Sequence, residues 1–239
     1  MGRPRYRKSA MMGLYVVDKP LGWSSMDVVR RVRNAAGFIK TGHGGTLDPL
    51  ATGVIVCLMG NATRSVEAIM GMPKVYETTI DLSAFANTDD REGLREEVEV
   101  ETPPTEDQVR AVLQTFIGDI EQVPPLFSAV HVDGERAYKR ARKGEDVEIP
   151  SRIVHVEHIE LLSYEFPRLT IRVDCGRGTY VRSLARDIGK ALGTGGHLES
   201  LVRTAIGPYR IEDAHSLDDP ELRITQFDLL DAPKVEKQK

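Results

Sequence analysis

The chain has 239 residues and is 41% hydrophobic, which is enough to bury one substantial core. Its first ten residues are basic but lack the apolar run of a signal peptide, and no stretch approaches the roughly 18 apolar residues of a membrane span, so we expect a soluble, cytoplasmic protein. The formal net charge of −4 does not exclude a nucleic-acid partner, because the charges are segregated along the chain.

A short strand ending at Val17 leads into the first predicted helix. Ser24 and Asp27 match a capping box, which satisfies backbone donors at a helix start. An apolar stripe at helical spacing follows, and Gly37 is its natural end. We therefore predict a helix between Ser24 and Gly37.

One strand is predicted before a second helix, and another strand after it. Residues 53–58 are continuously apolar, as in a buried strand, and Asn61 is a suitable cap for a helix that closes at Gly71. Residues 75–82 predict a strand that places Tyr76, Thr78, Ile80 and Leu82 on one face, and Tyr76 begins that face.

Residues 89–107 are acidic and predict a surface excursion. They hold nine acids against two arginines, which leaves thirty basic and twenty-seven acidic residues in the rest of the chain. Two basic clusters stand out there; their members are Arg3, Arg5, Arg7 and Lys8, then Arg136, Lys139, Arg140, Arg142 and Lys143. Either cluster alone is as well explained as a solvated face, but the two together favour a localised polyanion site.

The second half of the chain mixes strands and helices without a repeating βαβ rhythm. Thr105 opens an amphipathic helix that Gly118 ends. Two alternating strands near 153–162 and 169–175 and a helix over 179–192 follow. This order predicts an α+β fold in a single domain.

The sequence offers no recognisable metal site. Cys57 and Cys175 stand alone in apolar surroundings, which favours buried free thiols. His155 and His158 are the only close histidines, and their spacing of three in a strand puts them on opposite faces. We therefore expect no metal.

One window concentrates glycines around a carboxylate. GHGGTLDPLATGV, residues 42–54, places Asp48 just ahead of the buried strand, and Pro49 stiffens the chain after the acid. Glycines allow a ligand to approach the backbone closely, so a fixed carboxylate at a sheet edge is one interpretation. An ordinary Asp-Pro turn before a strand is the other, and from spacing alone it is the simpler.

A second window, residues 175–193, places Tyr180 and Arg182 in the first turn of a helix that leaves a strand. Arg182 and Arg186 share one helix face. From spacing alone, an exposed salt-bridge face with Asp187 explains both arginines.

These windows, together with DKPLGWSS (18–25), KVYETTIDL (74–82), residues 122–145 and GGHLESLVRTAIGPY (195–209), resemble the TruB family of tRNA pseudouridine-55 synthases. The resemblance covers about residues 12–209 in the family's order, and because it joins several long motifs it outweighs both simpler explanations. It implies the pseudouridine synthase fold, a mixed, mainly antiparallel central sheet flanked by helices. Residues 1–209 would form the catalytic domain, with an RNA-gripping insertion at about 122–150, and residues 210–239 a short tail with no separate domain.

The resemblance also implies an activity. The chain would be an isomerase that converts uridine-55 in the T loop of tRNA to pseudouridine, without a cofactor. Asp48 would be the catalytic carboxylate, and Arg182 would pair with it and keep it ionised in a water-poor cleft. Tyr76 would stack on the flipped uracil, and Tyr180 would lie beside the base as a proton acceptor.

Further residues would contact the substrate. By resemblance, His43 fills the space that the flipped nucleotide leaves, and Lys19 supports the cleft near the catalytic loop. The basic run from Arg136 to Lys143 matches the RNA-gripping insertion. The expected partner is the T stem-loop of tRNA, bound by a monomer.

The sequence departs from the family in two places. Gly44 stands where the family usually has threonine, which is expected to loosen the loop before Asp48. Residues 210–239 are too few for the C-terminal RNA-binding domain of many members.

Two other functions compete with this one. A tRNA-binding or tRNA-folding module without catalysis would share the basic clusters and the aromatic platform, but it would not need Asp48 or Arg182. A carboxylate enzyme acting on small glycosides usually needs two acids, and neither window shows a partner acid.

Overall fold

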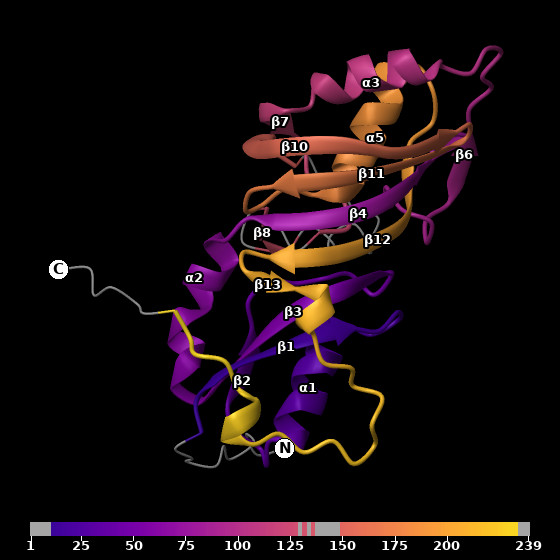
Figure 1. Cartoon of the computed structure of the whole chain (residues 1–239). Helices are drawn as coiled ribbons and strands as arrows, with labels where there is room; N and C mark the ends of the chain where they lie inside the picture. The colour runs from indigo at the N-terminus through magenta and orange to yellow at the C-terminus, as the bar shows by residue number, and fades with distance from the viewer. Residues whose placement is uncertain (1–10, 129–130, 133–134, 137–148, 234–239) are drawn as a thin grey trace. The chain divides into compact units, whose positions relative to one another are not determined.

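The computed structural model describes residues 11–128, 131–132, 135–136 and 149–233 (Figure 1). The chain forms two compact units. Residues 1–75 and 202–239 belong to unit 1, and residues 76–201 belong to unit 2. Strands β4 (Lys74–Asp81) and β12 (His197–Ile206) carry the chain from one unit to the other.

Unit 1 is built around β3 (Ala51–Met59), a strand whose consecutive apolar residues are nearly all buried. β1 (Gly13–Lys19) pairs antiparallel with β3, and β2 (Thr41–His43) pairs antiparallel with its last three residues. The buried strand that the apolar run predicted is therefore confirmed.

Helix α1 (Ser25–Ala35) begins as its capping box predicts. Ser24 is the N-cap, its hydroxyl accepts from the Asp27 N–H, and the Asp27 carboxylate accepts from the Ser24 N–H. The apolar stripe of the helix is buried. The helix ends before Gly37, whose φ of +70° suits a glycine.

The second predicted helix has a different start. Residues Gly60–Ser65 form a 3-10 helix, and α2 (Val66–Gly71) follows. Asn61 lies inside the 3-10 turn and does not cap it, because the N-cap is Met59. Ile69 is the buried residue of α2 and packs in a core with residues from three strands; that core contains Leu14, Val16, Val54, Val56, Leu58, Ala62, Ile69 and Ile206.

The C-terminal tail is irregular and belongs to unit 1. After the short strand β13 (Tyr209–Arg210) it contains only the 3-10 turns Ile211–Asp213 and Gln226–Asp228 within the described residues. Two isolated bridges join it to β1, at Leu14↔Leu230 and Val17↔His215.

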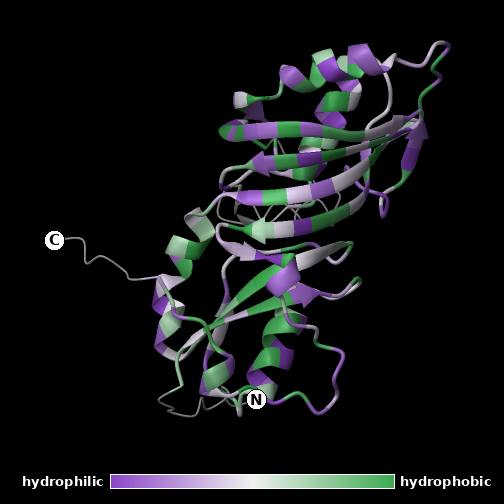
Figure 2. Ribbon diagram, in the orientation of Figure 1, coloured by the Kyte–Doolittle hydropathy of each residue, from purple (hydrophilic) through white to green (hydrophobic). Residues whose placement is uncertain are grey.

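Unit 2 contains a sheet in the order β12, β4, β11 (Arg168–Cys175), β10 (Arg152–Glu165) and β7 (Gly118–Gln122). Hydropathy alternates along β10 and β11, as bands of colour show (Figure 2). A register shift between Val156 and His158 leaves Glu157 as an extra residue. His155 and His158 are therefore both exposed, and the prediction that they lie on opposite faces is wrong.

Helices α3 (Glu106–Gln114) and α5 (Val181–Leu192) pack against each other in unit 2. Thr105 opens α3 as predicted, and it forms a capping box with Gln108. Gly118 does not end α3 directly, since it begins β7, a strand that the sequence did not reveal. Two small hairpins complete the described elements: β5 (Ala84–Ala86) with β6 (Arg95–Glu97), and β8 (His131–Val132) with β9 (Glu135–Arg136).

The arrangement is α+β with a mainly antiparallel sheet, as predicted. Among the described residues, no helix is long and apolar enough to cross a membrane.

Candidate active site

The predicted site residues are divided between the two units. Lys19, His43 and Asp48 belong to unit 1, whereas Tyr76, Tyr180 and Arg182 belong to unit 2. Arg136 lies in β9. The remaining members of the basic run, Lys139, Arg140, Arg142 and Lys143, lie outside the described residues.

The Asp48 loop, residues 44–50, joins β2 to β3 and is held by its own backbone. Every carbonyl oxygen from Gly45 to Pro49 accepts a hydrogen bond. The donors are Arg203 to Gly45 (3.1 Å) and Thr46 (3.2 Å), the Ser25 hydroxyl to Leu47 (3.0 Å), the Ala51 N–H to Asp48 (3.1 Å), and Lys19 (3.3 Å) and the Gly22 N–H (2.9 Å) to Pro49. Because five consecutive carbonyls are fixed, the half-buried Asp48 side chain projects from a rigid stretch of backbone.

Lys19 lies beneath this loop with none of its surface exposed. Its ammonium donates to the carbonyl oxygens of Pro20 (2.9 Å) and Trp23 (2.7 Å), as well as to Pro49. Burial lowers the pKa of Lys19, while the nearby Asp48 carboxylate opposes this effect. Lys19 thus contacts the Asp48 loop through a direct hydrogen bond to Pro49, and its role in the substrate cleft stays a prediction.

His43 ends β2 and faces the start of the loop. The Gly45 N–H donates to its Nδ1 (3.3 Å). Burial, with a further contribution from the Arg203 guanidinium, holds the pKa of His43 below its usual value. A neutral imidazole is therefore favoured beside the loop.

Gly44 is buried, and the space beside it is filled. A Cβ at this position would lie 2.2 Å from Cγ2 of Ile69 and 2.8 Å from its Cβ. Both distances are far below an ordinary carbon–carbon contact of about 3.5–4.0 Å. The Ile69 side chain thus occupies the volume that a larger residue would need at position 44, and the loop start packs closely in spite of the glycine.

Tyr76 lies in β4, where Thr78 and Ile80 share its buried face, as the alternation predicted. The Thr78 hydroxyl donates to the Ser200 carbonyl (2.7 Å), which fixes this part of β4 against β12. The tyrosine therefore rises from a well-ordered strand.

Tyr180 is the N-cap of α5 and not part of its first turn, since its backbone is extended. Gln122, which is 1% exposed, binds the Tyr180 backbone on both sides: its amide accepts from the Tyr180 N–H (2.8 Å) and donates to the Tyr180 carbonyl (3.1 Å). The Arg152 guanidinium carbon lies 4.9 Å from the centre of the tyrosine ring, a cation–π contact. The position of Tyr180 is thereby fixed from two adjacent strands.

Arg182 is in the first turn of α5 and is buried. Its guanidinium donates to Asp90 Oδ2 (3.3 Å) and to the carbonyl oxygens of Thr88 and Phe127 (3.2 Å each). The exposed salt-bridge face with Asp187 therefore does not describe Arg182, although Arg186 does bond to Asp187 (2.9 Å). Pairing of Arg182 with Asp48 stays a prediction.

The acidic stretch is not a surface excursion throughout. Asp89 and Asp90 are 8% and 3% exposed, and Asp89 pairs with Arg186 (2.7 Å). Burial raises the pKa of Asp89, against the opposing charges of Arg186 and Arg182. Composition alone could not separate these two internal carboxylates from their solvated neighbours.

Sequence reasoning therefore missed three residues around the candidate site: Asp90, Gln122 and Arg203. Asp90 was hidden in an acidic run, and Gln122 ends a strand that was not foreseen. Arg203 carried one usable signal, since it is an arginine inside an apolar motif, VRTAIG.

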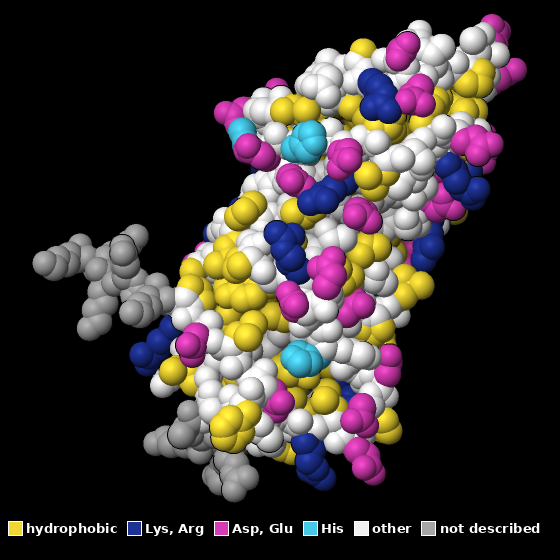
Figure 3. Space-filling model, in the orientation of Figure 1, with side chains coloured by type: hydrophobic (Ala, Val, Ile, Leu, Met, Phe, Trp, Pro, Cys, Tyr) yellow, Lys and Arg dark blue, Asp and Glu magenta, His cyan; other side chains and the backbone are white. Residues whose placement is uncertain are grey.

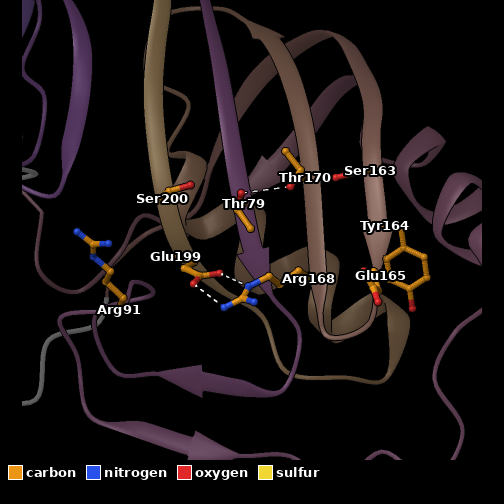
Figure 4. Close-up of a pocket in the computed structure, with 9 residues that line it drawn as sticks. All are labelled: Thr79, Arg91, Ser163, Tyr164, Glu165, Arg168, Thr170, Glu199 and Ser200. Carbon is orange, nitrogen blue, oxygen red and sulfur yellow. Dashed lines mark hydrogen bonds and ion pairs between the residues drawn. The ribbon is translucent and has the colours of Figure 1, made fainter.

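A polar hollow lies elsewhere, on the sheet of unit 2 (Figure 4). It has a volume of ≈ 550 Å³, and Arg168 binds Glu199 across it through two hydrogen bonds (3.1 and 3.2 Å). Acidic and basic side chains are interspersed over this part of the surface (Figure 3). None of the predicted site residues lines the hollow.

Among the described residues, no group of three or more His, Cys, Asp or Glu could hold a metal ion. Unit 1 offers one carboxylate on a rigid loop, and unit 2 offers a buried arginine and a fixed tyrosine at one helix terminus. Such groups suit covalent or proton-transfer chemistry.

Comparison with known proteins places the chain in a family. Residues 32–181 match the model of the TruB family pseudouridylate synthase N-terminal domain, and residues 182–228 match the tRNA pseudouridylate synthase B C-terminal domain. The second match extends past Tyr209, where the motifs recognised in the sequence end.

Individual relatives and a solved structure are also similar to this chain. The chain is 48% identical to the tRNA pseudouridine synthase B of Dinoroseobacter shibae, over 91% of this chain and 71% of the relative, and 46% identical to that of Phocaeicola vulgatus, over 84% and 88%. A chain in the crystal structure of a Cbf5-Nop10-Gar1 complex matches with a TM-score of 0.69 at 33% identity. The match covers 87% of this chain and about half (53%) of the other.

Proposed function

The chain belongs to the TruB family of pseudouridylate synthases, and on that premise we propose that it isomerises uridine-55 in the T loop of tRNA, with Asp48 as the catalytic carboxylate. It is an isomerase with the pseudouridine synthase fold. The observation that carries the proposal for Asp48 is the loop itself: it presents one carboxylate on a backbone in which five consecutive carbonyls are bound.

The reaction requires three changes in the nucleotide. The glycosidic bond between ribose C1′ and uracil N1 breaks, the uracil rotates, and a bond forms between C1′ and C5. The proton on C5 leaves and N1 gains a proton, so atoms and electrons balance without a redox cofactor. Asp48 starts this sequence by attacking the ring, attacking the ribose or removing a ribose proton, and Tyr180 accepts the C5 proton.

The uridine must leave its loop before it can react. Extruding a base costs a few kcal/mol, and stacking on an aromatic ring returns roughly 1–3 kcal/mol. Tyr76 supplies that ring, and the order of β4 around it supports the role. His43 fills the space that the base leaves; the low pKa of its imidazole suits a neutral, stacking side chain.

Arg182 orients Asp48 and compensates its charge. The buried pair with Asp90 supports this role, because the Asp90 carboxylate and two backbone carbonyls together fix the orientation of the guanidinium. An arginine held in this way can meet a carboxylate without reorganising.

The substrate is the T stem-loop. The basic run from Arg136 to Lys143 binds its phosphates, and residues 1–209 act as a monomeric catalytic domain in the cytoplasm, with residues 210–239 as a tail. Phosphate contacts give affinity and position, whereas the flipped base gives the chemistry.

The test compares Asp48→Asn with Asp219→Asn, an exposed aspartate of the tail. Tritium release from tRNA labelled at uracil C5 measures turnover, and filter binding measures affinity. Asp48→Asn should abolish release and keep tRNA binding, while Asp219→Asn should match the unmodified protein. Turnover by Asp48→Asn would remove Asp48 from its role. Binding without release by the unmodified protein would favour a tRNA-folding module.

A further inference from the structure

Arg203 is the largest of the fully buried side chains, at 1% exposure, and it lies in β12 beside the Asp48 loop. We propose that Arg203 is a positioning residue for Asp48: its guanidinium fixes the backbone on both sides of the carboxylate, and with Lys19 it forms a pair of buried cations beneath the loop. This inference rests on the proposed role of Asp48.

The contacts of Arg203 all go to one short part of the chain. Its Nε donates to the Val54 carbonyl (2.8 Å), and its two terminal nitrogens donate to the carbonyls of Thr46 (3.2 Å) and Gly45 (3.1 Å). Gly45 and Thr46 precede Asp48, and Val54 follows it in β3. One rigid, planar group therefore sets the separation between the two arms of the loop.

A buried guanidinium is costly, which makes its partners informative. In the part of the chain that the structure describes, no carboxylate is among the hydrogen-bond or ion-pair partners of Arg203. Replacing a buried charge with a well-packed apolar residue is often neutral or favourable for stability. A cation whose donors go only to backbone carbonyls of the loop and of the strand that follows it is poorly explained by stability, and well explained by the geometry and charge that it gives the loop.

Lys19 fixes the backbone at the other end of the loop. It donates to Pro49, directly after Asp48, and its hydrogen-bond partners too are backbone carbonyls. The pKa of Lys19 is lowered first by burial; Asp48 raises it and Arg203 lowers it. Lys19, Arg203 and Asp48 therefore lie within one electrostatic environment, to which the carboxylates of Asp18 and Asp27 also contribute.

The packing of β12 against β3 holds Arg203 in place. A Cβ at Gly53 would lie 2.3 Å from the Arg203 carbonyl oxygen and 2.8 Å from its backbone nitrogen. Gly53 also has a φ of +100°, which other residues rarely adopt. The glycine thus lets the Arg203 backbone approach β3 closely enough for its side chain to reach back under the loop.

Two substitutions and one control test the inference. Arg203→Gln removes the charge and the three-point contact; Arg203→Lys keeps the charge but not the planar fork. Leu14→Ala, in the same unit and remote in sequence from the loop, is a core substitution that lowers stability through packing alone. Single-turnover rates on labelled tRNA, tRNA affinity, and the pKa of His43 by NMR are measured for each protein.

Arg203→Gln should lower the rate by about a hundredfold, because a loop displaced by about 1 Å misplaces the carboxylate. Its tRNA affinity should stay within about threefold. The pKa of His43 should rise, since Arg203 contributes to lowering it. Arg203→Lys should recover part of the rate and leave the pKa of His43 low.

The inference is overturned if Arg203→Gln reacts within about threefold of Leu14→Ala while the unmodified protein is active. If circular dichroism shows Arg203→Gln unfolded, Arg203→Lys decides by the same criterion. An inactive unmodified protein would instead refute the proposed function, so the two failures are distinguishable.

Discussion

The close contact between Gly44 and Ile69 predicts that even a methyl group at position 44 destabilises unit 1. Gly44 does not have a φ in the left-handed region, so Gly44→Ala acts through packing and not through backbone strain. The new Cβ would lie 2.2 Å from Ile69 Cγ2. Overpacking of this kind costs about 1–3 kcal/mol of unfolding free energy.

Removing the obstructing side chain should largely abolish this effect. Ile69→Ala alone leaves a cavity and costs about 2–5 kcal/mol. In that background, Gly44→Ala should be nearly neutral, because the remaining Cβ–Cβ contact of 2.8 Å needs only a small shift that the cavity allows. The coupling energy of the double-mutant cycle should therefore reach about 1–3 kcal/mol.

Urea unfolding followed by Trp23 fluorescence measures the cycle, since Trp23 is the only tryptophan and lies in unit 1. Gly42→Ala is the matched control: nothing lies within 4 Å of a Cβ at Gly42, so its effect should be small. Free energies that add to within about 0.5 kcal/mol would refute the reasoning. Additivity would also restore the expectation that Gly44 loosens the loop.

Further predictions concern the RNA, the chemistry and pH. Activity on a hairpin that folds without magnesium should persist in excess EDTA, measured by tritium release; loss of activity would contradict the metal-free proposal. Charge reversal at Arg140 and Arg142 should weaken tRNA binding and flatten its salt dependence by roughly 0.7–0.9 in logarithmic slope per lost phosphate contact, and an unchanged slope would assign the run to a solvated face. An isolated T stem-loop should react nearly as well as whole tRNA, so a preference of about a hundredfold in kcat/KM for the whole tRNA, about 2.7 kcal/mol, would reveal contacts elsewhere. Because the pKa of His43 is lowered in the folded chain, the unfolded chain binds the proton more readily, and the unfolding free energy should fall as pH drops below about 6.5. In urea titrations at two pH values, His43→Gln should show a smaller decrease in unfolding free energy than the unmodified protein. An equal decrease in both proteins would contradict the lowered pKa of His43.

Local signals in the sequence predicted local structure well. The capping boxes at Ser24 and Thr105 gave the starts of α1 and α3 because a cap depends only on residues within one helical turn. The alternation over β4 placed Tyr76 correctly on the buried face. The order of predicted strands and helices gave the α+β class, and the family motifs then gave the pseudouridine synthase fold, because their order along the chain carries topology that periodicity lacks.

Strands whose partners are distant in sequence were harder to foresee. β7 exists because residues 118–122 pair with residues 152–156 of β10, and nothing within residues 118–122 indicates that partner. β12 was not predicted as a strand, since the buried Arg203 interrupts its apolar pattern. The same long-range dependence hid Gln122, whose role appears only when α5 is in place.

The buried ion pairs also change how the charge of the chain supports an RNA site. Counting along the sequence assigned Asp89 and Asp90 to an acidic surface, but they neutralise Arg186 and Arg182 inside unit 2. With Arg182 and Arg186 set aside as the partners of these two acids, twenty-eight basic and twenty-seven acidic residues remain outside residues 89–107, so segregation of net charge hardly favours a polyanion. Phosphates respond to charges within a screening length of about 10 Å, not to a sum over the chain. The case for RNA binding therefore depends on local density, five basic residues in eight positions from Arg136 to Lys143, which is why the salt dependence after reversal of Arg140 and Arg142 tests it directly.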